Sequence, residues 1–227
     1  MLKRSVFQRA CLLFLCVLLA LPLASCGAAE NLLGRLGFDT HDYRGEKTQR
    51  VHAPDSETAE MLAAMMRRLS VNSPILTPFS GAKEAADACR DGVLNQLLES
   101  GYAQYAGNRA LLARAADAYP LLHISILIPA ADFETVIYAS FGGSERIVNR
   151  SGELFRYLDK IDAYTTAATP QPSSVVTTVL LCEETERTYR LTFENSLDGV
   201  VSPTYFALII KREDGSLYIR SLETAKK

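Results

Sequence analysis

The feature that most constrains this chain is an uncharged apolar run near its N-terminus. The run covers residues 10–25, follows three basic residues and precedes the first acidic one, Glu30. A positively charged start, an apolar stretch and small residues after it are typical of a secretory signal peptide. A membrane-spanning helix needs about 20 apolar residues, whereas this run is shorter and is broken near its end by Pro22. We therefore expect a cleaved signal rather than a spanning segment.

The residues that end this run indicate where the signal is cut. Leu23-Ala24-Ser25-Cys26 resembles the lipobox of bacterial lipoproteins, with an apolar residue three positions before the cysteine and small residues between. The resemblance implies that the Cys26 thiol carries a diacylglycerol and that Cys26 becomes the first residue of the mature protein. Two or three acyl chains anchor a protein stably, because each buried methylene contributes about 0.8 kcal/mol. The resemblance implies a lipid-anchored protein on the extracytoplasmic face of a bacterial cell membrane, and Gly27 adds no signal for retention at an inner membrane.

The predicted mature chain is mildly acidic. Cleavage removes three of the 24 basic side chains and no acidic one, which leaves 21 basic against 26 acidic side chains and a net charge of −5. A nucleic-acid-binding protein needs a basic face for the phosphates, so we expect no nucleic-acid partner. Charge does not draw such a domain to an anionic lipid surface either, so the lipid on Cys26 is the predicted attachment to the membrane.

Few residues are available for metal or disulfide chemistry. Besides the predicted lipid site, the mature chain has only Cys89 and Cys182. An oxidising compartment would allow one disulfide between them, and the alternative is two buried free thiols. The histidines, His41, His52 and His123, have no partner at helical ligand spacing. We expect no metal site and no cofactor.

Helical patterns dominate the first half of the mature chain. We expect helices near residues 56–69, 80–100, 108–119 and 132–141. Ser56, Asn108 and Asp132 each stand where a side chain can cap a helix start. Gly142-Gly143 would end the last helix.

Strand patterns dominate the second half. The expected strands cover residues 121–129, 146–149, 153–158, 174–183, 187–195, 204–213 and 216–222. Asp198-Gly199 and Asp214-Gly215 are expected turns. Glu183, Glu184 and Glu186 are expected at a hairpin tip in water, which is the wrong place for acid–base chemistry.

The order of these elements predicts one α+β domain, with N-terminal helices packed on one face of a curved antiparallel sheet. The arrangement loosely resembles the cone-shaped cystatin-like and nuclear transport factor two-like folds. We expect a signal peptide at residues 1–25, a lipidated cysteine and flexible tether at 26–55, and the α+β domain at 56–227. As a flexible coil, the 29 residues after Cys26 would span roughly 30 Å.

The sequence contains no recognised catalytic motif. Ser144 follows two glycines but lacks the strand–turn–helix context of a nucleophile elbow. The same two glycines are too few for a phosphate-binding loop. We therefore expect a protein that is not an enzyme.

Four tyrosines are the candidates for a ligand site. Tyr157, Tyr189, Tyr205 and Tyr218 fall on predicted strands. A gap between sheet and helices would form a pocket that tyrosine rings wall and their hydroxyls make polar. The alternative is that these rings form the core and its rim.

Together these features predict a lipid-anchored, extracytoplasmic, non-catalytic module that binds an envelope protein or a cell-wall component such as peptidoglycan. A small-ligand-binding protein with a pocket between helices and sheet is the alternative. An envelope hydrolase is a third hypothesis, which no motif supports.

Overall fold

The computed structural model describes residues 43, 45–170 and 172–225. Residues 45–227 form one unit by their contacts. The predicted signal peptide, the lipobox with Cys26, the residue His41 and most of the predicted tether lie outside the described residues. Among the described residues, no helix is both long and apolar enough to cross a bilayer.

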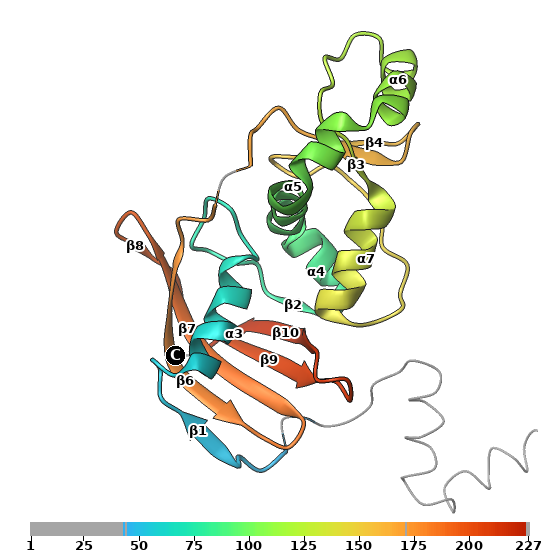
Figure 1. The fold of residues 1–227 in the computed structure, drawn as a ribbon. Coiled ribbons are helices and arrows are strands. Elements are labelled where there is room, and N and C mark those ends of the chain that lie inside the picture. The colour runs from blue at the N-terminus through green and yellow to red at the C-terminus, as the bar shows by residue number, and fades with distance from the viewer. Residues whose placement is uncertain (1–42, 44, 171, 226–227) are drawn as a thin grey trace, which may run out of the picture. The chain divides into compact units, whose positions relative to one another are not determined.

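The described part of the chain is an α+β structure with two antiparallel sheets (Figure 1). Its elements in chain order are β1 (Arg50–His52), α3 (Glu57–Arg67), β2 (Phe79–Ser80), α4 (Ala82–Ala88), α5 (Arg90–Gly107), α6 (Arg109–Ala118), β3 (Ile128–Pro129), α7 (Ala130–Phe141), β4 (Arg156–Leu158), β5 (Ala163–Thr165), β6 (Val176–Glu184), β7 (Thr188–Leu197), β8 (Val200–Val201), β9 (Tyr205–Lys211) and β10 (Leu217–Thr224). The larger sheet has the order β1-β6-β7-β9-β10-β2, with β8 paired to β7, and the smaller one has the order β3-β5-β4. The predicted α+β class with an antiparallel sheet is confirmed.

Helix α3 packs against β6 and β7 of the larger sheet. The Ser56 hydroxyl caps it by accepting a hydrogen bond from the Ala59 amide at 3.2 Å, as predicted. Its buried side recurs at helical spacing, with Leu62 and Met66 fully enclosed. Burying two such side chains contributes about 3–6 kcal/mol, so the apolar stripe rather than the cap holds α3 on the sheet.

The other helices and the smaller sheet lie between β2 and β6 in the sequence. Asn108 caps α6 through the Leu111 amide, as predicted. Helix α7 packs against α4 and β10 and ends at Gly142, whose φ of 69° favours glycine. Its predicted Asp132 cap is wrong, because the helix starts two residues earlier at Ala130, and the Asp132 carboxylate instead accepts a hydrogen bond from the Tyr105 hydroxyl.

The long hairpins of the larger sheet agree with the turn chemistry of the sequence. Strands β6 and β7 pair around Thr185, and β9 and β10 pair around Asp214-Gly215. Their core-facing side chains share one hydrophobic cluster with α3, α4, α5 and α7. Within it, the Phe79 and Phe141 rings meet edge to face with centroids 5.3 Å apart, which joins β2 to α7.

Three strand and boundary predictions are wrong. Only Ile128–Pro129 of the expected strand 121–129 pairs with another strand, and residues 146–149 form no strand. The predicted tether does not extend to residue 55, because Arg50–His52 form β1 and pair with Glu184, Glu183 and Cys182 of β6. The unit that includes this strand begins at Gly45.

Candidate functional site

The most developed polar cluster is found where the chain enters the larger sheet. We call residues 45–52 the entry segment. Its last three residues are β1, which pairs with β6 and has no second partner strand among the residues that the structure describes. Just before the strand, the Gln49 amide donates to the Glu184 carbonyl at 2.8 Å, and the Thr48 hydroxyl donates to the Glu183 carboxylate at 2.9 Å. The entry segment is therefore hydrogen-bonded to the end of β6 through both backbone and side chains.

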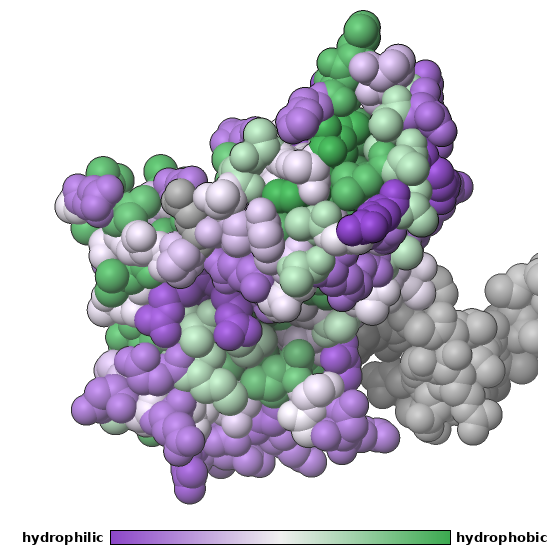
Figure 2. Space-filling view, turned by 45° about the horizontal axis from the view of Figure 1, so that its top comes forward, coloured by the Kyte–Doolittle hydropathy of each residue, from purple (hydrophilic) through white to green (hydrophobic). Residues whose placement is uncertain are grey.

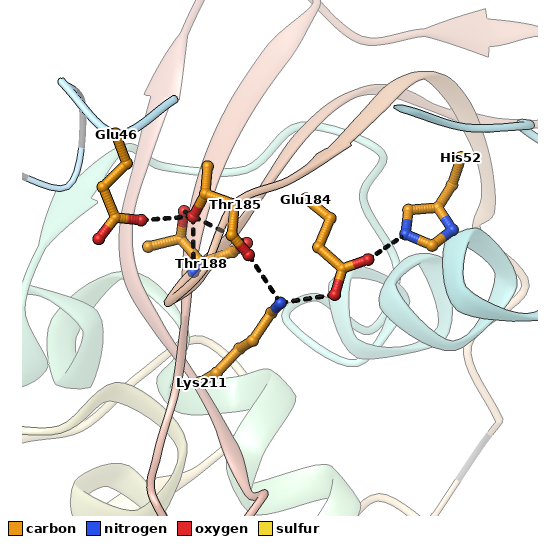
Figure 3. Close-up of polar contacts among 6 residues, drawn as sticks. All are labelled: Glu46, His52, Glu184, Thr185, Thr188 and Lys211. Carbon is orange, nitrogen blue, oxygen red and sulfur yellow. Dashed lines mark hydrogen bonds and ion pairs between the residues drawn. The ribbon is translucent and has the colours of Figure 1, made fainter. Parts of the chain in front are cut away.

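The Glu184 carboxylate is the centre of this cluster (Figure 3). One of its oxygens accepts a hydrogen bond from Lys211 Nζ at 2.6 Å, and the other is 2.8 Å from His52 Nε2. An ionised carboxylate only accepts hydrogen bonds, so His52 Nε2 carries the donated hydrogen. The Glu184 and Lys211 side chains are 23% and 22% exposed and that of His52 is 10% exposed. One carboxylate thus joins β1, β6 and β9 in a site largely shielded from water.

A chain of threonine hydroxyls extends the cluster to the start of the entry segment. Lys211 Nζ also donates to the Thr185 carbonyl at 2.9 Å. The Thr185 hydroxyl is 2.8 Å from the Thr188 hydroxyl and donates a short hydrogen bond to the Glu46 carboxylate. Arg190 donates to the Glu46 backbone carbonyl at 2.6 Å. We call this set of contacts, centred on Glu184 and Thr185, the entry clamp.

The electrostatics of the entry clamp favour an ionised Glu184. Its pKa is lowered, first by the hydrogen bond from Lys211 and then by the one from His52. The Lys211 ammonium also lies 4.4 Å from the centre of the Tyr189 ring. Burial, followed by the negative charge of Glu184, raises the pKa of the Tyr189 hydroxyl. Both Glu184 oxygens accept hydrogen bonds, so this carboxylate links β1 and β9 to the end of β6.

The sequence interpretation missed this cluster. Glu184 was expected in water at a hairpin tip, but it lies within β6 and is shielded by partners from two other strands. His52 was expected in a tether, but it belongs to β1. The pattern of Arg50, Val51 and His52 is too short to predict a strand. Strand β1 becomes recognisable only through its pairing with β6, about 130 residues later in the sequence.

The structure does not bring the four candidate tyrosines together. Tyr157 belongs to the smaller sheet, where its hydroxyl donates to Asp162 at 2.6 Å. Tyr205 is fully buried in the core, and its hydroxyl exchanges hydrogen bonds with the Leu76 backbone. Tyr189 packs beside the entry clamp, and Tyr218 lies under Arg212, 4.7 Å from its guanidinium. A shared ligand role for them stays a prediction that these positions do not support.

A surface cleft lies instead beside the smaller sheet. Its volume is about 490 Å³, which is within the range of small-ligand sites. Three segments line it: residues 122–124, 151–156 and 165–167. They bring His123, Glu153 and Arg156 to its walls together with the apolar residues Leu122 and Ile124. None of the four candidate tyrosines lines this cleft.

One wall of the cleft is fixed by a carboxylate from α5. Asp91 accepts hydrogen bonds from the amides of Glu153 and Leu154 at 2.8 and 3.2 Å. The loop approaches Asp91 so closely that a Cβ on Gly152 would lie 2.2 Å from its Oδ1. Only glycine fits there without a shift, because real Cβ contacts are longer than 3.0 Å. The cleft wall is therefore pre-formed by residues 62 and 63 positions apart in the sequence.

The two cysteines of the described residues form neither a disulfide nor part of a metal site. Cys89 and Cys182 are both free and buried, so no disulfide joins them. Burial raises the pKa of the Cys89 thiol, and burial together with Glu184 and Glu183 raises that of Cys182. Within the same part of the chain, no three histidine, cysteine, aspartate or glutamate side chains gather as a metal site would require.

No family model, curated protein or solved structure matches this chain.

Proposed function

We propose that this chain is a lipid-anchored, extracytoplasmic binding module, attached to a bacterial cell membrane through Cys26. Its partner in this proposal is an envelope protein or a cell-wall component such as peptidoglycan. The entry clamp carries the proposal, because it fixes the point at which an N-terminal anchor would hold the domain. The lipobox at residues 23–26 supplies the other end of the connection.

A lipid-anchored domain is connected to its anchor by the chain between them, so the length of this linker sets how far the domain extends from the membrane. Eighteen residues separate Cys26 from Gly45, where the unit begins. As a coil they would span about 24 Å, and fully extended about 65 Å. The point where the linker enters the domain would therefore lie within about 65 Å of the membrane surface, and the domain would reach partners farther out by its own diameter. The entry clamp would keep the N-terminal end of β1 paired when the linker is stretched.

The contacts of Glu184 suit a structural role in the entry clamp. Both of its carboxylate oxygens accept hydrogen bonds, which join β1, β6 and β9. We also propose, as a finer description of the α+β fold, that the helices cover one side of a curved sheet as in cystatin-like folds.

Labelling with palmitate tests the anchor. Cells that express the full chain are grown with labelled palmitate, and the protein is isolated and its label measured. The wild type and a Cys16→Ala control, which changes a signal-peptide cysteine outside the lipobox, should both incorporate label. A Cys26→Ala variant should incorporate none. Equal labelling of the Cys26→Ala variant, or no labelling of the wild type, would contradict the proposal.

Crosslinking of the full chain in its native envelope tests the binding role. The chain is purified under denaturing conditions, and covalently attached proteins or glycan fragments are identified by mass spectrometry. One near-stoichiometric envelope protein or one peptidoglycan fragment is the expected result. Recovery of the chain alone, at several crosslinker lengths, would count against a protein or cell-wall partner.

The cleft beside the smaller sheet favours a second candidate function, the binding of a small ligand. His123 and Arg156 offer hydrogen-bond donors and the partly exposed Leu122 and Ile124 an apolar surface, which suits a small molecule with both polar and apolar parts. Native mass spectrometry of gently purified protein should then show an added mass. An Ala167→Trp variant, which adds bulk at an exposed residue that lines the cleft, should lose it, and an Ala103→Trp variant on the exposed side of α5 should keep it. Only the apo mass for all three proteins would reject this function.

A further inference from the structure

The pairing between β3 and β5 of the smaller sheet stops early. Strand β3 pairs with β5 only through Ile128 and Pro129, and just beyond it the Ala130 amide donates to the Asp162 carbonyl at 3.0 Å. Before Ile128, residues 123–127 belong to no strand, turn or bend. Their side chains still alternate, exposed at 123 and 125 and more buried at 124 and 126. Residues 123–127, which we call the open segment, therefore continue β3 as an extended chain without pairing to β5.

Two hydrogen bonds show which backbone groups of the open segment face β5. In a strand, the N–H and C=O groups of successive residues point alternately to the two neighbours. The Ala130 amide points to β5, whereas the Leu127 amide points away from it and donates to the Tyr105 carbonyl of α5 at 3.2 Å. The backbone groups of Ile124 and Ile126 therefore face the side of β5. Neither residue forms a hydrogen bond with another residue that the structure describes.

The opposite side of this gap carries unpaired backbone groups as well. The register of β3 and β5, continued by two residues, would place Thr166 opposite Ile126. The Thr166 backbone makes no hydrogen bond to any part of the chain that the structure describes. Ile126 is 5% exposed and Thr166 is 7% exposed, and buried backbone groups nearly always have a partner. Facing rows of unpaired backbone groups are the partners that an added strand requires.

The cleft beside the smaller sheet lies at this gap. Its lining includes residues 122–124, at the start of the open segment, and residues 165–167, at the end of β5 and after it. Three or four residues of extended chain are about 10–13 Å long, a length suited to a cleft of about 490 Å³. In Figure 2, apolar side chains gather at the top of the view, over the region where Figure 1 places α6 and the smaller sheet. Leu121, next to the lining, is 97% exposed, so apolar side chains of a ligand would find apolar surface there.

The lining also presents one charge of each sign. Arg156 and Glu153 both line the cleft and are exposed. Neither side chain forms an ion pair or hydrogen bond with another of the described residues. A free peptide carries a carboxylate at one end and an ammonium group at the other, which complement these two charges. A segment inside a longer chain carries neither terminal charge, so a short free peptide fits the lining better.

We propose that the cleft binds a free peptide of three or four L-residues, extended between the open segment and the residues that follow β5. The proposal rests on the second candidate function, that the cleft is a ligand site, and it names the class of that ligand. The peptide backbone pairs with Ile124 and Ile126 on one side and with Thr166 on the other. Its carboxylate faces Arg156 and its ammonium group faces Glu153.

Selection from a peptide library tests the ligand class. The full chain in mild detergent is incubated with a library of L-tetrapeptides that have free termini, and bound peptides are identified by mass spectrometry after gel filtration. The matched control is the library of D-tetrapeptides, which has the same composition and the opposite chirality. The wild type and Ala103→Trp should retain L-peptides and no D-peptides. Ala167→Trp, at the cleft lining, should retain neither.

Amide hydrogen exchange, resolved by residue, tests the strand pairing. The most enriched tetrapeptide should slow exchange at Ile124 and Ile126 about tenfold or more, because their amides face the peptide. The amides of Ser125 and Leu127 point to the other side and should exchange as before. Equal slowing at all four positions would show general stabilisation without strand pairing and would overturn the proposed binding mode.

Blocking the peptide termini tests the charge contacts. Acetylation of the amino end and amidation of the carboxyl end should each weaken binding about fivefold, as expected for exposed ion pairs. Arg156→Gln should abolish the effect of amidation, and Glu153→Gln should abolish the effect of acetylation. A peptide that is weakened by amidation alone would point to the C-terminal end of a longer chain and would overturn the assignment to a free peptide.

The failure of this proposal can be distinguished from the failure of the second candidate function. An added mass on the native protein that is not a peptide, with no library peptide retained, would keep the cleft as a ligand site and overturn the peptide assignment. The absence of any added mass together with no retained peptide would overturn both.

Discussion

The Glu184→Gln substitution is the sharpest perturbation of the entry clamp. It keeps the size of the side chain but removes the charge that Lys211 and His52 contact at 2.6 and 2.8 Å. A hydrogen bond to a charged group contributes about 1.5–3 kcal/mol. Exposed ion pairs contribute up to about 1 kcal/mol, and breaking a fully buried pair costs about 3–5 kcal/mol. Glu184 is 23% exposed, between these limits, and glutamine retains one acceptor, so we expect a loss of about 2 kcal/mol.

Thermal unfolding and amide hydrogen exchange measure this loss. For a chain of this size, about 2 kcal/mol lowers Tm by about 4–8 °C. The amides of β1 should exchange up to about 30-fold faster, since 1.4 kcal/mol is a factor of ten. The matched control is Glu186→Gln, two residues away on the exposed turn of the same hairpin. Its Tm and its β1 exchange should equal those of the wild type.

The pH dependence separates the charge of Glu184 from its packing. Its pKa is lowered in the folded state, by Lys211 first and His52 second. A carboxyl with a lowered folded pKa stabilises the protein above its unfolded pKa, about 4.3, and this stabilisation is lost as pH falls through the folded pKa. The stability difference between wild type and Glu184→Gln should therefore be constant above about pH 5 and shrink at lower pH. A difference that stays unchanged down to pH 2, or a Glu184→Gln variant as stable as Glu186→Gln, would refute the reasoning.

Three further predictions concern the core, the cleft and the thiols. Tyr205→Phe leaves the buried amide and carbonyl of Leu76 without their side-chain partner, so urea unfolding should show a loss of about 1–3 kcal/mol. Gly152→Ala places a methyl group 2.2 Å from Asp91 Oδ1 and should cost about 1–3 kcal/mol in the same assay, whereas Gly107→Ala, with nothing within 4 Å of the added methyl, should not destabilise. Iodoacetamide should leave both cysteines of the domain unmodified in native protein and alkylate both in denaturant, since each is buried and free. Alkylation of either thiol in the native state at the rate of an exposed cysteine would contradict this burial.

Local signals in the sequence account for the elements that were predicted correctly. Ser56 and Asn108 cap the helices they precede, and glycine at position 142 ends α7. The β6–β7 and β9–β10 hairpins follow from alternation on both sides of a turn. In each case the contact that forms the element lies within a few residues of the motif that predicts it. Local propensity and turn chemistry are therefore enough to predict these elements.

The elements that were missed depend on contacts between distant residues. Strand β1 exists because β6 offers an edge to it, and three residues carry too little alternation to show this. Residues 121–127 alternate like a strand, but residues 122–124 line the cleft, and of the expected strand only Ile128–Pro129 pairs with β5. The entry clamp joins positions 46, 52, 184 and 211, which no local pattern connects. Tyr157 lies on β4 of the smaller sheet, whereas Tyr189, Tyr205 and Tyr218 lie on three strands of the larger sheet and contact different neighbours there. Strand patterns alone do not specify which strands pair or which neighbours a ring meets.

The intact mass of the protein isolated from its own cell envelope tests the central claim most directly. The proposal predicts a chain that begins at Cys26, lacks residues 1–25, and carries the added mass of a diacylglycerol that is localised to Cys26 by fragmentation. An unmodified chain that begins after Cys26, or one that retains Met1 and carries no lipid, would contradict it.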